Sequence, residues 1–235
     1  MIFDILTLII IVVFAIVGFK TGAAKVIARL LALVSAFVLS LFLSHFLAEL
    51  VYNTFIRQAV MDNITKVIND SALASANDKA TALLEGLPEL LSNSLVYFGI
   101  DNARITSLFD VNAAEKIQSL IMTPVVGVIS IIFFIILFII LLFLLRKVFS
   151  FVAKVFRLPV IRVIDSAVGL VVGLLEGGFA VYILAFLSRL AIPFTGGELY
   201  ILNEAYVSSS YVFSMFYFGT LNSFVQSFIY SLGNI

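Results

Sequence analysis

An acid, Glu176, stands inside a run of apolar and small residues. Residues 165–180 read DSAVGLVVGLLEGGFA, with Asp165 at the start and Glu176 further along. A charged acid at the centre of a membrane helix costs about 2.5–3.5 kcal/mol on insertion scales, so such an acid faces other helices and pairs with a base or takes up a proton. Two interpretations of Glu176 stay open: a paired structural acid, or a relay for protons or a substrate.

The same stretch carries glycine at every fourth position, at Gly169, Gly173 and Gly177. At ~100° per residue, these glycines share one helix face with Asp165 and Glu176. Small residues at this spacing allow two helix backbones to approach closely in a membrane. The pattern favours helix packing, and a face that lines a polar path is the alternative.

A second glycine pair with the same spacing, Gly18 and Gly22, lies in the segment GFKTGAAK. This segment predicts a tight hairpin between two helices, with a broken element of a transporter as the alternative. If the hairpin packs against the glycine face, three bases are candidate partners of Glu176: Lys20, Lys25 and Arg29. Anchoring to anionic lipid headgroups is the other role that fits these bases.

Composition leaves little support for other site chemistry. The chain has no Cys and only one His, so it has neither disulfides nor thiolate metal ligands, and a His-based metal site or triad lacks residues. Asp165 and Glu176 are separated along one helix by about 16 Å of rise, too far for an acid–base pair. We expect no catalytic residue, no metal and no cofactor, and the protein is predicted not to be an enzyme.

The balance of residue types predicts a membrane protein. Hydrophobic residues make up 63% of the chain and charged residues 12%, whereas soluble domains have about half and about a quarter. A net charge of zero gives no indication of nucleic-acid binding. Four segments approach or exceed the ~20 apolar residues that cross a bilayer as a helix. They cover residues 2–19, 26–51, 124–145 and 168–187.

These segments predict an all-α fold, an integral membrane four-helix bundle, in four parts. A transmembrane hairpin, 1–51, precedes a polar insert, 52–123, whose short amphipathic helices pack on each other or lie on the membrane. A second hairpin, 124–190, begins at Pro124 and contains a basic loop, 146–167. The tail, 191–235, is rich in Phe, Tyr, Ser and Asn, which predicts an interfacial helix, with a fifth span as the alternative.

The distribution of bases sets the expected orientation. The first hairpin turn carries only bases, and the loop 146–167 carries five bases against one acid. Both lie on one side if four helices alternate, and that side is expected to be cytoplasmic, with anionic lipid as a partner. The insert has five bases against eight acids and is expected outside with the N-terminus.

Three features together resemble the colicin V production protein (CvpA) family of bacterial membrane proteins. They are an acid-led first helix followed by GFKTGAAKVIARLLA at 18–32, a long apolar helix ending in bases, and IDSAVGLVVGLLEGGFAVYIL at 164–184. The resemblance covers residues 1–51 and 124–190. The chain departs from the family pattern at Glu176, where a base or a small residue is common.

The resemblance implies a multi-pass protein of the bacterial cell membrane that takes part in toxin production or export and in envelope homeostasis. It implies a non-enzymatic assembly component, and we expect it to assemble through its glycine faces, as a homo-oligomer or with a membrane-protein partner. The alternative is a small transporter or channel that uses Glu176 and the glycine-rich faces.

Overall fold

The computed structural model describes residues 2–70, 73, 75–87, 95, 99–109, 112–155, 162–191 and 207–219, and every regular element among them is helical. The all-α prediction is therefore confirmed. Four helices are long and apolar enough to cross a membrane, as predicted. They are α1 (Ile2–Thr21), α2 (Ala23–Val51), α7 (Ala113–Val155) and α8 (Arg162–Ala191).

The described helices form two compact units. The first consists of Met1–Ser40 and Ile136–Ile235, and the second of Leu41–Ile135. The long helices α2 and α7 contribute residues to both units. Large apolar side chains such as Ile9, Ile139 and Val171 are exposed on the long helices, as expected for surfaces that face lipid.

The second unit contains the insert. After α2, a π-helical turn, η1 (Tyr52–Ile56), leads into α3 (Arg57–Asn69), which is followed by α4 (Ala76–Glu85) and α6 (Asn102–Thr106). A capping box begins α4, in which the Ser75 hydroxyl accepts from the Asp78 N–H and the Asp78 carboxylate accepts from the Ser75 N–H.

One apolar core joins the short helices of this unit. Ile64, Leu83, Ile105 and Ile117 are buried together in it. The insert helices therefore pack on each other, which is one of the two arrangements predicted for them. A buried hydrogen bond, from Gln118 Nε2 to the Tyr52 hydroxyl at 3.2 Å, fixes the irregular turn against α7.

The extent of α7 differs from the predicted segments. A span that begins at Pro124 and a basic loop from residue 146 were expected, but a single helix covers Ala113–Val155 with Pro124 inside it. The missing proline N–H removes one helical hydrogen bond. Ile121 and Val125, on either side of the proline, are buried in the apolar core of the second unit, and this packing offsets the loss.

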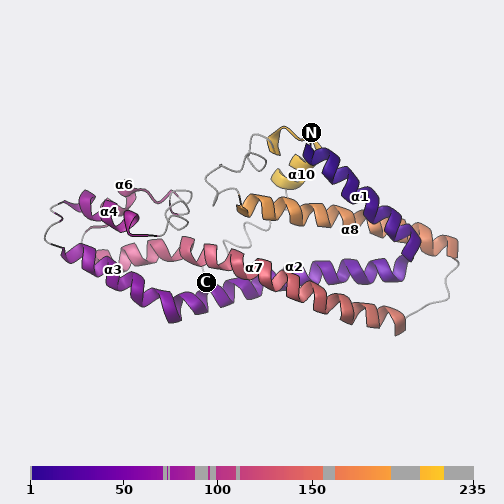
Figure 1. Ribbon diagram of the computed structural model, residues 1–235, viewed down its shortest axis with the longest axis horizontal. Helices are drawn as coiled ribbons and strands as arrows, with labels where there is room; N and C mark the ends of the chain where they lie inside the picture. The colour runs from indigo at the N-terminus through magenta and orange to yellow at the C-terminus, as the bar shows by residue number, and fades with distance from the viewer. Residues whose placement is uncertain are drawn as a thin grey trace. The chain divides into compact units, whose positions relative to one another are not determined.

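In the first unit, α1 and α8 pack along each other, and a short helix, α10 (Val212–Phe218), contacts both (Figure 1). Phe3, Val181, Ala185 and Phe213 are among the buried residues of their shared core. The described part of the tail is thus a helix too short to cross a membrane. The remainder of the amphipathic pattern predicted for it, 220–235, lies outside the described residues.

Candidate functional site

The glycine face of α8 lies directly against the backbone of α1. A Cβ atom added to Gly173 would stand 2.5 Å from the carbonyl oxygen of Phe14, and one added to Gly177 would stand 3.0 Å from the Cα of Ile11. Gly169 and Gly18 likewise each face the other's backbone. Any side chain at these positions would force the two helices apart, so the glycine spacing sets the closeness of this contact.

The glycine face is therefore covered by α1 of the same chain. We expected this face to bind a second copy or a partner, and the structure places a helix of the chain itself on it. Since α1 and α8 belong to one polypeptide, their association does not carry the entropic cost of bringing two separate chains together. The glycine face is thus not accessible to a partner while α1 covers it.

Asp165 acts at the turn between the first two helices. Only Gly22 separates α1 from α2, and its φ of +81° lies in the left-handed region that favours glycine. Asp165 Oδ1 accepts a hydrogen bond from the Ala23 N–H at 2.9 Å, and a Cβ on Gly22 would clash with the same carboxylate. Asp165 thus caps the start of α2 from α8, and a single residue connects α1 to α2 within the segment GFKTGAAK.

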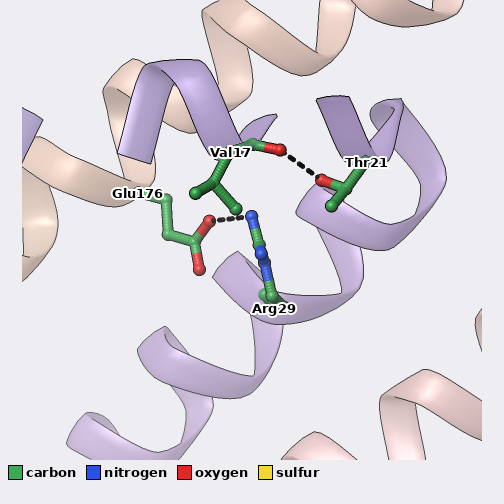
Figure 2. Close-up of polar contacts among 4 residues, drawn as sticks. All are labelled: Val17, Thr21, Arg29 and Glu176. Carbon is green, nitrogen blue, oxygen red and sulfur yellow. Dashed lines mark hydrogen bonds and ion pairs between the residues drawn. The ribbon is translucent and has the colours of Figure 1, made fainter. Parts of the chain in front are cut away.

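Arg29 contacts the acid that the sequence singled out. Arg29 Nη2 donates to Glu176 Oε2 at 3.0 Å, which joins α2 to α8 (Figure 2). Glu176 is fully buried, whereas the Arg29 side chain is 30% exposed. The same view shows a separate hydrogen bond within α1, from the Thr21 hydroxyl to the Val17 carbonyl oxygen.

The pair leaves hydrogen-bonding capacity unused within the described part of the chain. Glu176 Oε1 and Arg29 Nε are both buried there without a hydrogen-bond partner. The carboxylate oxygen can take up a proton or accept a hydrogen bond from a small polar group, because a buried acceptor is costly to leave unpaired. The other two candidate partners of Glu176, Lys20 and Lys25, are exposed.

Asp4 and Arg189, to which the sequence assigned no role, both contact α10. The Asp4 carboxylate accepts from the backbone N–H groups of Tyr211, Val212 and Phe213, at 2.7–3.2 Å, which caps the start of α10. Arg189 Nη1 donates to the carbonyl oxygen of Tyr217 at the other end of α10, 3.2 Å away. These contacts join residues far apart in the sequence, and an acid near the N-terminus was the only signal.

The fold and this site define an all-α membrane protein in which a buried acid, paired with a partly exposed arginine, lies next to a glycine-mediated helix contact. Among the described residues, no group of three His, Cys, Asp or Glu side chains could hold a metal ion. The chain matches no protein-family model, no curated protein and no solved structure at a level that would establish a relationship.

Proposed function

We propose that this protein is a non-enzymatic assembly component of a bacterial cell membrane, similar to the CvpA family, that serves toxin production or export and envelope homeostasis. The supporting observation is the meeting of two of the stretches that carry the resemblance. Gly18 and Gly22 of the first stretch contact Gly169, Gly173 and Asp165 of the last. Two stretches of the family-like pattern that are far apart in the sequence thus meet in the contact between α1 and α8.

The proposed role is structural, and the α1–α8 pair is its rigid element. Its glycine face is occupied, so a second copy or a partner would bind the apolar side chains that point away from it. Ile9 and Val13 of α1 and Val171 and Leu175 of α8 are exposed residues of this kind. In lipid, such faces associate through shape and packing, because burial from water provides no driving force there.

A complementation experiment tests this function. Cells that lack the protein should release less toxin onto a sensitive indicator strain and should become more sensitive to detergent. The wild-type chain should restore both properties. Gly169→Ala should fail to restore them at equal protein level, because its methyl group meets the Gly18 backbone.

Gly178→Ala is the matched control. It places the same methyl group on the same helix, where nothing lies within 4 Å, and should complement fully. The proposal is wrong if the deleted cells release toxin and resist detergent as well as the parent strain does.

A second candidate function is supported by the Glu176–Arg29 pair. The buried, unpartnered Oε1 of Glu176 could bind a proton or another small cation in a small transporter or channel. In proteoliposomes, the wild-type chain should then dissipate a proton or cation gradient and Glu176→Gln should not. Glu85→Gln, at an exposed position of α4, provides the control. Absence of flux for every cation tested would reject this candidate.

Orientation and lipid contacts form part of the same proposal. The exposed bases Lys20, Lys25, Arg146 and Lys147 would face the cytoplasmic leaflet and its anionic headgroups. Arg146 and Lys147 lie on α7 itself, and the Lys147 ammonium stands 4.4 Å from the centre of the Phe143 ring. A base combined with an exposed aromatic ring is suited to the boundary between headgroups and acyl chains.

A further inference from the structure

The contact between α1 and α8 changes character along its length. At one end, Gly18 faces Gly169 and Gly173 at backbone distance. Toward the start of α1 the facing residues are larger, with Phe3 near Val181 and Ala185 in the core that α10 completes. Two helices in backbone contact at one end must separate where larger side chains stand between them.

The short helix α10 supplies side chains where α1 and α8 separate. Phe213 is fully buried and Tyr217 is 2% exposed, both in the same core as Phe3 and Val181. The Phe213 ring stacks on the Phe3 ring with centroids 4.9 Å apart. Figure 1 shows α10 beside the first turns of α1 and the last turns of α8, away from the Gly18 end of α1.

Charges from two different helices hold α10 at its two ends. Asp4 of α1 accepts from the N–H groups of its first turn, and Arg189 of α8 donates to Tyr217 O while its guanidinium lies 5.6 Å from the Tyr217 ring centre. A negative group at the start of a helix and a positive group at its end both stabilise the helix, because each interacts favourably with the helix dipole. A helix of seven residues is unstable alone, so α10 depends on these contacts to stay in place.

We propose that α10 is a removable wedge that sets the angle between α1 and α8, with the glycine contact as the pivot. With α10 docked, the first turns of α1 are held apart from α8 by Phe213 and Tyr217. With α10 released, α1 turns about the Gly18–Gly169 contact. Glu176 lies on α8 between Gly173 and Gly177, which both contact the α1 backbone, so this movement changes the surroundings of the Glu176–Arg29 pair.

Spin-label distances in lipid nanodiscs test the wedge. The chain has no Cys, so pairs of Cys can be introduced for labelling and no native Cys must first be replaced. Labels at the exposed positions Ile5 and Leu175 report the angle between the helices, and labels at Phe19 and Val171, also exposed, report the pivot. Asp4→Ala removes the cap of α10, and Phe213→Ala removes a fully buried aromatic side chain of this helix.

Both variants should shift or broaden the Ile5–Leu175 distance distribution and leave the Phe19–Val171 distribution unchanged. Met215→Ala, at a 73% exposed position of the same helix, should change neither. The proposal is overturned if Phe213→Ala leaves the Ile5–Leu175 distances as in the wild type. It is also overturned if the pivot distances change to the same extent, because the whole contact would then have loosened.

Discussion

Glu176 and Arg29 form a contact whose energetic value depends on both members being present. Burying a charge without its partner is much more costly than burying the pair, and replacing both by apolar residues can be close to neutral. Glu176 has no exposed surface, so it cannot recover hydration if Arg29 is lost. Because little water reaches Glu176 within a membrane span, losing Arg29 alone should cost even more relative to replacing both residues.

We therefore predict strong non-additivity for this pair. Arg29→Met should lower the free energy of unfolding in detergent by about 3–5 kcal/mol, while the double variant with Glu176→Met should lie much closer to the wild type. Lys25→Met, at an exposed position of α2, should change stability by about 0.5 kcal/mol at most. If the effects of the two single substitutions simply add, the pair is not energetically coupled.

Asp165 permits a finer test, because its role requires an acceptor oxygen and not a charge. Asp165→Ala should cost about 0.5–2 kcal/mol of stability through loss of the Ala23 N–H bond. Asp165→Asn should retain most of this stability, since the Asn side-chain oxygen caps a helix as well as that of Asp. Thermal unfolding of both variants in the same detergent measures the difference. Equal losses in the two variants would show that the charge, and not the cap, matters.

At the scale of helices, the glycines of α8 differ sharply in what surrounds them. Gly173→Ala should destabilise the α1–α8 contact, because its Cβ would lie 2.5 Å from the Phe14 carbonyl oxygen. Gly178→Ala should leave stability unchanged or raise it by up to about 1 kcal/mol, because its surroundings are open and Ala favours the helix. Unfolding midpoints in detergent separate the two cases, and a similar decrease for both variants would contradict the packing argument.

Local sequence patterns predicted the positions of the long helices. They did not predict features that depend on contacts between residues far apart in the sequence. The spacing of Gly169, Gly173 and Gly177 correctly predicted a face for close helix packing, because one helix alone defines that face. Its occupant could not be predicted, since α1 reaches it only through the fold. Pro124 was placed at a helix start on local grounds, and burial of the residues around it in the second unit keeps α7 continuous.

At the scale of the whole molecule, the same distinction applies to the tail. Hydropathy and aromatic content in 191–235 left a fifth span open. The bonds from Asp4 to the start of α10 require residues 211–213 to lie at the same end of the α1–α8 pair as the N-terminus, and residues 220–235 lie outside the described part of the chain. No single-sequence pattern contains this information, because the acid and its three donors are separated by about two hundred residues.

These contacts give a topology prediction that uses the absence of native Cys. If the four candidate spans alternate as proposed, the N-terminus, the insert and α10 should lie on the outer side and the bases on the inner side. Tyr211→Cys, 80% exposed, and Phe55→Cys, 71% exposed in the insert, should both react with a membrane-impermeant maleimide on intact cells. Lys20→Cys and Lys147→Cys should react only after the cells are opened. Two spans, α1 and α2, separate Asp4 from Phe55, so these residues are expected on the same side of the membrane. If Phe55→Cys reacts from outside but Tyr211→Cys does not, Tyr211 lies on the opposite side from Asp4, and α10 is not docked on Asp4 in the membrane.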